Sequence, residues 1–351
     1  MIDWFRREYQ RAPGLYLSLV VVLASFLAYS SSFGVGFHFD DEHHIVGNPY
    51  ITELSNAGEF FFRPDMFSAM QGHDMYRPLV MLSFALDFAA FGFDPWGWRL
   101  TAIALHALCA AGVFFAIRGV LTGDRQRVDT ISTAAAMLFA VHPLFSETVL
   151  YASARSTLLA TLGFVWAFVA HRAAWGRGPG LGRALLVGVS LILFAAALLA
   201  KESAIVLPAL LLWCSVVDRR HYAAFVPALL VAAGYLYLRG QVLDSTVIDF
   251  ASRTGGDAAA ALHSGAARPV SWNLFTQARV IAAYLGMFLV PRGLCIDHSV
   301  RISTTVFELP VVFGGLLILG MLMAAWRVRR THPIVSIGVV WFFFALAPTS
   351  S

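Results

Sequence analysis

Charged residues are scarce in this chain of 351 residues: they make up 13% of it, and hydrophobic residues make up 58%. A soluble domain carries about a quarter charged residues, so this composition excludes an ordinary soluble domain. Its long runs of Leu, Val, Ala and Phe are solvated well only by a bilayer. The net charge of +4 gathers in short Arg-rich segments. That placement indicates orientation in a membrane and argues against nucleic acid as a partner.

Cysteine is also scarce. Cys109, Cys214 and Cys295 lie far apart without CxxC spacing, which excludes a disulfide framework and a cysteine-based zinc site. Cys109 and Cys214 fall in apolar runs, where a free cysteine behaves as a small hydrophobic residue. A cleavable signal peptide is not indicated, because the basic segment Met1–Arg11 leads into a run long enough to span the membrane. No internal repeat is visible.

Ten apolar runs are present, and each is expected to be helical because lipid offers the backbone no hydrogen-bond partner. They are Leu15–Phe33, Trp96–Ile117, Ile131–Val141, Leu158–Val169, Ala184–Ala200, Ala204–Val217, Tyr222–Leu238, Ala278–Val290, Val311–Ala325 and Pro333–Leu346. The sequence thus predicts an all-α, polytopic transmembrane protein of about nine or ten spans. Whether the region 276–291 crosses the membrane or lies flat is left open.

The distribution of basic residues predicts the orientation. The expected cytoplasmic segments are Met1–Arg11, Arg118–Arg127, Arg172–Arg183, Asp218–His221 and Arg327–Arg330. The expected outward segments are Gly34–Pro95, His142–Ala154, the turn at Lys201 and Arg239–Gln277. Counting Pro78–Phe91 as a span would place Arg118–Arg127 outside, so this helix is predicted to lie in the outer interface with Arg77 and Asp87 at its ends.

These segments predict a single membrane domain over residues 1–351. Residues 12–33 form the first span, residues 34–95 an outer loop with interfacial helices, and residues 96–351 the remaining helices. The last span ends at Ala347-Pro348-Thr349-Ser350-Ser351 without a basic loop. The sequence therefore reads as one cut off within a longer architecture.

The first outer loop opens with acidic and histidine residues, Asp40-Asp41-Glu42-His43-His44. Carboxylates at a membrane face are costly unless they serve a function, and one held there is suited to act as a general base. A solvated acidic cap on the helix end is the structural alternative. His43 and His44 also allow a divalent metal with the carboxylates as further ligands, although adjacent residues diverge on regular structure.

Basic residues on the same predicted face supply what a lipid phosphate requires. Tyr76 and Arg77, before the interfacial helix, are both expected to bind the donor phosphate. Arg155 opens a span, and Lys201 stands between two apolar runs with Glu202 as a supporting acid. Each of these cations alone is compatible with snorkelling to the interface, but their convergence with the acids favours a phosphate-binding cluster.

The outer turn at His142-Pro143 adds two further candidates. Glu147 is expected to pair with Arg155, and His142 to donate to a phosphate oxygen. His106, inside an apolar span, is interpreted as a packed, hydrogen-bonded residue.

The order and spacing of these motifs resemble a known family. Asp40-Asp41, Tyr76-Arg77-Pro78-Leu79, Phe91–Leu105 with His106, His142-Pro143 with Glu147, Ala154-Arg155-Ser156 and Ala200-Lys201-Glu202 look like the membrane half of the transmembrane TPR-containing O-mannosyltransferases and their bacterial relatives. Those are GT-C class glycosyltransferases. Asp297-His298 and the segment Trp341 to Ser350 are weaker matches.

The resemblance implies inverting transfer of mannose or a similar hexose from a polyprenyl-phosphate donor to a protein or glycan acceptor. The family's acidic catalytic residue maps onto Asp40 or Asp41, and Glu42 adds a third acid. Its basic positions map onto Arg77, Arg155 and Lys201. The expected location is a bacterial inner membrane with the site facing the periplasm, or the ER membrane and lumen in a eukaryote.

Two other functions remain in view. One is a non-catalytic GT-C-like membrane subunit that acts as a scaffold or binds lipid phosphate. The other is a transporter or flippase, which is disfavoured because the charges gather on one face and no inverted repeat is visible.

Overall fold

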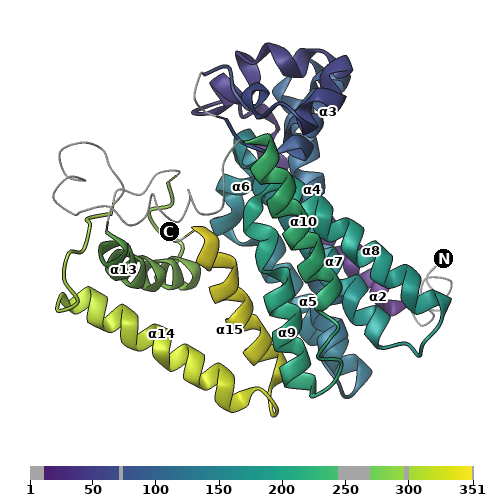
Figure 1. Ribbon diagram of the computed structural model, residues 1–351, viewed down its shortest axis with the longest axis vertical. Helices are drawn as coiled ribbons and strands as arrows, with labels where there is room; N and C mark the ends of the chain where they lie inside the picture. Colours follow the sequence, from purple (N-terminus) through teal and green to yellow (C-terminus); the bar gives the residue numbers. More distant parts are fainter. Residues whose placement is uncertain (1–11, 71–73, 244–268, 296–299, 350–351) are drawn as a thin grey trace. The chain divides into compact units, whose positions relative to one another are not determined.

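The computed structural model describes residues 12–70, 74–243, 269–295 and 300–349, and all of their regular structure is helical (Figure 1). This confirms the predicted all-α class. Met1–Arg11 and the pair Asp297-His298 lie outside the described residues. The chain divides into two compact units, Met1–Leu207 and Pro208–Ser351, and each is described by itself.

The first unit is built on five long helices. They are α2 (Pro13–Ala28), α4 (Pro95–Val120), α5 (Arg125–Val141), α7 (Arg155–Trp175) and α8 (Leu181–Ala200). α4 contacts α2, α5 and α7, and α7 packs along α8. Small residues allow the close approach: a Cβ on Gly163 would lie 2.7 Å from the Leu193 carbonyl oxygen, and one on Gly112 would lie 2.7 Å from Val165.

Local sequence explains where these helices begin. Pro13 and Pro95 stand at the first turns of α2 and α4, where the missing N–H costs nothing. The carboxylates of Asp94 and Asp124 cap α4 and α5 by accepting the backbone N–H groups of Trp96 at 3.1 Å and Arg127 at 3.0 Å. Such caps satisfy backbone donors that the helix itself leaves unpaired.

The predicted outer loop forms a small helical layer at one end of these long helices (Figure 1). It contains the 3-10 turns η1 (Ser30–Gly34), η3 (Pro49–Thr52), η4 (Leu54–Phe61) and η5 (Pro64–Phe67), the π-helical turn η2 (Glu42–Val46) and the helix α3 (Pro78–Phe91). Ile45, Ile51, Phe60 and Phe84 are among its buried core residues. α3 has the predicted bounds and contacts η3, η4, α4, α7 and α8.

Short elements return the chain to this layer from the long helices. They are η6 (Pro143–Phe145), α6 (Ser146–Leu150) and η7 (Ala152–Ala154) between α5 and α7, and η8 (Glu202–Val206) after α8. Segments far apart in sequence therefore meet beside the first loop.

The second unit contains α9 (Leu207–Asp218), α10 (Val226–Val242), α13 (Val270–Leu289), α14 (Leu309–Val328), α15 (Pro333–Leu346) and the turn η9 (Ala347–Thr349). α14 contacts both α13 and α15. The Trp213 indole N–H donates to the Ser336 hydroxyl at 3.2 Å, which ties α9 to α15.

Four described helices are long and apolar enough to cross a membrane: Pro95–Val120, Ala152–Trp175, Leu181–Ala200 and Leu309–Val328. The pair Arg125–Val141 and Pro143–Leu150, bent by 47°, makes a fifth if it acts as one span. The chain is therefore an integral, multi-pass membrane protein. Each of the ten predicted apolar runs coincides with a helix. The count of nine or ten spans, and the crossing of region 276–291, remain predictions.

Candidate functional site

The two adjacent aspartates of the first loop lie in opposite environments. The Asp41 side chain is completely buried. Its Oδ1 accepts both the backbone N–H of Ser153 at 2.8 Å and the Ser153 hydroxyl at 2.7 Å, and its Oδ2 accepts the backbone N–H of His38 at 3.2 Å. These three donors satisfy the hydrogen-bonding capacity of a carboxylate that burial removes from water. Asp41 thus joins the first loop to the turn before α7.

Asp40 points outward instead, with 59% of its side chain exposed. Its backbone N–H donates to the Tyr151 hydroxyl at 3.2 Å. That hydroxyl and His43 beside the carboxylate hold the pKa of Asp40 below its usual value, so the group is an anion at neutral pH. Burial, followed by the neighbouring Asp40, raises the pKa of Tyr151, which therefore stays protonated.

The histidines after the acids lie on the same turn. His43 Nε2 is 3.4 Å from Asp40 Oδ1, and His43 Nδ1 is 2.9 Å from the Ser68 hydroxyl. His44 is buried, with Nδ1 3.1 Å from the Ser153 hydroxyl. One ligand atom from each of Asp40, His43 and His44 falls within 4.8 Å of the others. Glu42, which follows the aspartates, is exposed.

Arg77 stands at the N-terminus of α3 and is mostly buried. Its Nη2 donates to Glu202 Oε1 at 3.3 Å, and the guanidinium lies over the Phe67 ring, 5.7 Å from the centroid. His44 packs against the same phenylalanine, with its ring centroid 4.6 Å from that of Phe67. Phe67 therefore bridges the acid–histidine turn and the first predicted cation.

Lys201 caps the end of α8 and donates from Nζ to the Thr157 hydroxyl at 3.0 Å. Burial lowers the pKa of the Lys201 ammonium, and the nearby positive charge of Arg77 lowers it further. The carboxylates of Glu202 and Glu147 partly offset these effects. The positive charges of Arg77 and Lys201 thus oppose each other, and an additional anion near them would relieve the repulsion further.

Arg155 requires a correction. The sequence predicts it as a phosphate ligand paired with Glu147, but its side chain is buried and its Nη1 lies 2.5 Å from Asp87 Oδ2. Arg155 also donates to Ser83 Oγ at 3.2 Å and to the Trp98 carbonyl at 3.2 Å. Asp87, which the sequence places at the end of an interfacial helix, is likewise buried. The pair holds α3 against α4 and α7.

Three other residues singled out in the sequence are buried. Tyr76 is buried beside Arg77, and desolvation raises the pKa of its phenol. His142 caps the turn η6, where its Nδ1 accepts the backbone N–H of Leu144 at 3.1 Å, and its carbonyl accepts the Tyr29 hydroxyl at 3.5 Å. His106 is a packed residue as predicted, with Nε2 3.1 Å from the Ala140 carbonyl oxygen.

The structure therefore brings Asp40, His43 and His44 together on one turn and joins Arg77 to Glu202, with the Phe67 ring between His44 and Arg77. Lys201 precedes Glu202 in the chain, and its charge interacts with that of Arg77. Sequence reasoning missed Phe67, Ser68, Tyr151, Ser153 and Thr157, which hold these groups in place. The last three belong to one segment next to the predicted Arg155. The short polar side chains that follow an apolar helix in this segment are the sequence signal by which these residues could have been found.

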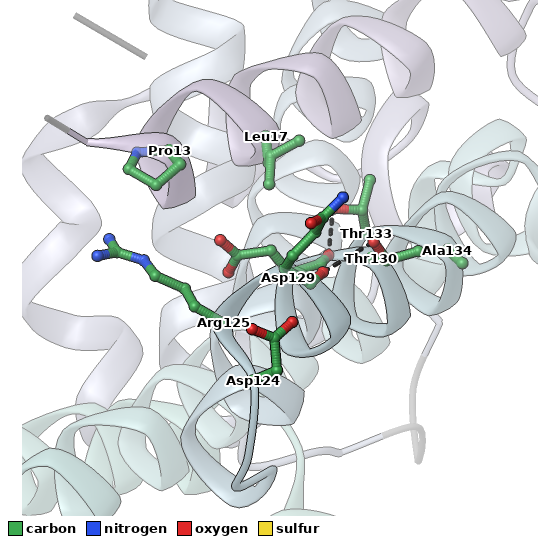
Figure 2. A pocket seen from close by; sticks show the side chains of 9 residues that line it. Pro13, Leu17, Asp124, Arg125, Asp129, Thr130, Thr133 and Ala134 are labelled. Carbon is green, nitrogen blue, oxygen red and sulfur yellow. Dashed lines mark hydrogen bonds between the residues drawn. The ribbon is translucent and has the colours of Figure 1, made fainter. Parts of the chain in front are cut away.

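A separate cavity of about 820 Å³ lies between the starts of α2 and α5 (Figure 2). Pro13, Leu17, Asp124 and Arg125 line it, together with Asp129. Asp129 accepts from Arg118 in the last turn of α4 at 2.6 Å.

The loop end of α4 is marked by Arg99, which donates to the Val35 and Gly36 carbonyls at 3.0 and 2.6 Å. At 1.5 Å per residue, Arg99 and Arg118 are roughly 28 Å apart along α4. The cavity shown in Figure 2 thus lies at the opposite end of α4 from Asp40 and Asp41.

Fold and site together define a multi-pass helical membrane protein with an open acid and two cations gathered at one end of its first unit. The chain is similar to protein O-mannosyl-transferases of animals. It is 32% identical to TMTC4 of Mus musculus over 209 residues, which cover 55% of the chain and 28% of that protein. It is 32% identical to Tmtc2 of Drosophila melanogaster over 62% of the chain and 23% of that protein.

Tmtc1 of Drosophila melanogaster is 33% identical over 55% of the chain and 22% of its own length. These matches confirm the resemblance drawn from the motifs: over the aligned residues the chain is similar to the TMTC protein O-mannosyl-transferases. Its aligned part spans about a quarter of the length of these relatives. No protein-family model matches the chain, and no solved structure matches it.

Proposed function

We propose that this protein transfers a sugar from a polyprenyl-phosphate carrier to a hydroxyl of a protein acceptor at the outer face of the membrane. Mannose is the preferred candidate for the sugar. The observation that carries the proposal is the arrangement at the loop end of the first unit. His44, on the turn that carries the exposed carboxylate of Asp40, and Arg77 lie against the same ring, that of Phe67, and the charge of Arg77 acts on a second cation, Lys201. The printed names of the relatives favour the same reaction class.

In this reaction the acceptor oxygen attacks C1 of the sugar while the bond from C1 to the phosphate oxygen breaks. The acceptor proton passes to Asp40, whose low pKa keeps it ionised and ready to accept. The pair of electrons from the broken bond stays on the lipid phosphate. Arg77 and Lys201 stabilise the negative charge that develops there. Attack from the face opposite the phosphate inverts the configuration at C1.

Asp41 serves this reaction as a positioning residue. It is buried and accepts from Ser153, so it fixes the loop that presents Asp40 and contacts no substrate. Arg155 likewise supports the site without binding the donor, because its charge is neutralised by Asp87. Of the residues predicted to hold phosphate, Arg77 and Lys201 are therefore the ones we assign to the donor.

The experiment is a transfer assay with the purified chain in liposomes, a polyprenyl-phosphate mannose donor and a Ser/Thr-containing peptide. Wild-type protein is expected to mannosylate the peptide, and Asp40→Asn is expected to lower the rate by about 10² to 10⁴, the usual contribution of a general base. Asp65→Asn is the matched control, since Asp65 is an exposed acid of the same loop that pairs with Arg63.

Equal activity in Asp40→Asn and wild type would refute the assignment of the acid. Donor binding without transfer by the wild-type chain would refute the enzyme and support the lipid-phosphate-binding subunit. The orientation is tested by adding peptide on one side of the vesicle only. Transfer should require the peptide on the side of the first loop.

A further inference from the structure

The π-helical turn after Asp41 gathers residues that regular structure would separate. On a strand or an ordinary helix, adjacent histidines diverge, but η2 (Glu42–Val46) places the rings of His43 and His44 with their centroids 4.2 Å apart. Ligand atoms of Asp40, His43 and His44 consequently lie within 4.8 Å of one another. π-helical turns of this kind are rare and frequently occur at functional sites.

The hydrogen bonds around His44 determine which nitrogen carries its proton. The Ser153 hydroxyl has one hydrogen, and it donates this hydrogen to Asp41 Oδ1 at 2.7 Å. The contact of 3.1 Å between the same hydroxyl oxygen and His44 Nδ1 must then be donated by the imidazole. With its proton on Nδ1, His44 carries a lone pair on Nε2. A carboxylate acting through a hydroxyl thus presents His44 as a ligand, in the manner of outer-shell partners at metal sites.

His43 is held in a similar way. Its Nδ1 contacts the Ser68 hydroxyl at 2.9 Å, and Ser68 in turn accepts the backbone N–H of Met70 at 3.0 Å. This contact orients the ring so that Nε2 faces Asp40 Oδ1 at 3.4 Å. Two ligands that bind one zinc ion tetrahedrally, with bonds of about 2.0 to 2.1 Å, lie about 3.3 Å apart. The separation of these two atoms is therefore already that of a metal-bound pair.

We propose that Asp40, His43 and His44 bind a divalent transition metal, with Zn²⁺ as the preferred ion. Two imidazoles and one carboxylate suit zinc and related metals, whereas Mg²⁺ and Ca²⁺ prefer oxygen ligands. The set also matches catalytic sites, which use three protein ligands and leave a position for substrate or water. Asp40 is the exposed member of the three, so an ion held by them would be reachable from solvent.

Metal binding stands independently of the proposed transfer, but its role in that reaction rests on the proposed function. An ion at this site would lower the pKa of a hydroxyl coordinated at its open position. That deprotonation is the step assigned above to Asp40. One oxygen of Asp40 would then hold the ion, and the other would remain to accept the proton of the acceptor hydroxyl.

The test measures zinc binding in the absence of donor and acceptor. The full chain is purified without a polyhistidine tag, stripped with a chelator and titrated with Zn²⁺ against a chromophoric competitor. One equivalent is expected to bind to wild type, and His43→Ala and His44→Ala are each expected to bind at least 100-fold more weakly. His38→Gln is the matched control, a histidine of the same loop outside the group of three. Ser153→Ala should weaken binding about 10- to 100-fold by loss of orientation.

A second readout separates lost binding from lost folding. Zn²⁺ is expected to raise the unfolding temperature of wild type and His38→Gln but not of His43→Ala, while the metal-free proteins unfold at similar temperatures. Co²⁺ substituted into wild type should give the visible absorption of a site with nitrogen ligands, absent in His43→Ala. Failure of wild type to bind Zn²⁺, or binding by both histidine variants as tight as that of wild type, would overturn the proposal. Since no sugar donor is used, a negative transfer assay leaves this result untouched.

Discussion

Two charged regions of the first unit differ in what satisfies their charge. Beneath α3, Arg155 and Asp87 neutralise each other at 2.5 Å, and Ser83, Thr101 and Trp98 supply further hydrogen bonds. Beside α3, the open cluster of Asp40, His43, His44, Arg77 and Lys201 has one exposed acid and two cations that repel each other. The buried pair is complete within the protein. In the open cluster Arg77 pairs with the half-exposed Glu202, and Lys201 donates to the neutral Thr157 hydroxyl, so these charges are compensated less closely.

This difference separates structure from function among residues that look alike in sequence. A charge inside a membrane protein is costly unless it is paired, so a pair such as Arg155 and Asp87 is retained for the geometry that it fixes. A buried lysine whose pKa is lowered by burial and by a neighbouring cation, as that of Lys201 is, is a candidate for binding a ligand. The comparison predicts that substitutions in the first region change stability and that substitutions in the second change binding and transfer.

The largest effect on stability is expected from breaking the buried pair. Arg155→Met leaves Asp87 as an unpaired buried carboxylate, and we expect the free energy of unfolding to fall by about 3 to 5 kcal/mol. Equilibrium unfolding in detergent measures this change. The double variant Arg155→Met with Asp87→Leu should recover most of the loss, because no unpaired charge remains.

Arg63→Met provides the matched control for that experiment, since Arg63 pairs with Glu59 and Asp65 on the exposed surface. It should leave unfolding unchanged, as exposed ion pairs contribute little. A double variant as unstable as Arg155→Met alone would show that shape, and not charge, is what the pair provides.

A smaller effect is expected from the open cluster, and it concerns the donor. Hydrogen bonds to charged groups contribute about 1.5 to 3 kcal/mol, so Arg77→Gln or Lys201→Gln should weaken donor binding by roughly 10- to 150-fold. Binding of a fluorescent polyprenyl phosphate in liposomes measures the loss. The same substitution at the exposed Arg63 should leave the affinity as it is, and a similar loss there would point to general electrostatic attraction.

The smallest effect concerns pH. Burial and the charge of Arg77 lower the pKa of Lys201, so its ammonium loses its proton at a lower pH than the usual value of about 10.4. The positive charge is present below the lowered pKa and is lost as pH rises through it. Donor affinity should therefore fall with rising pH in wild type and stay constant in Lys201→Arg. Identical pH profiles for the two proteins would remove Lys201 from the phosphate site.

Hydropathy predicted the helices well, because each apolar run must satisfy its backbone within itself. α3 was predicted with its observed bounds from Pro78 and the charge parity of the loops. Its role was not, since the partner of Asp87 is Arg155, distant in the sequence, and a sequence carries no direct record of such a pairing.

The same limit applies to the acids. Asp40 and Asp41 are adjacent and chemically identical side chains, so the sequence alone does not show which of them is exposed. The turn that follows them and the segment from Tyr151 to Ser153 decide that one carboxylate is buried and the other exposed. Metal-ligand spacing was equally hidden, because it depends on a π-helical turn rather than on an ordinary helix.

The most direct test of this account applies one substitution to both neighbours and measures two quantities for each. Asp40→Asn should abolish most sugar transfer with an unfolding temperature equal to that of wild type, because its side chain is exposed. Asp41→Asn should lower the unfolding temperature, because it weakens the buried bonds to Ser153 and His38. A loss of transfer in Asp41→Asn at full stability, with normal transfer in Asp40→Asn, would contradict the division between open and buried charge.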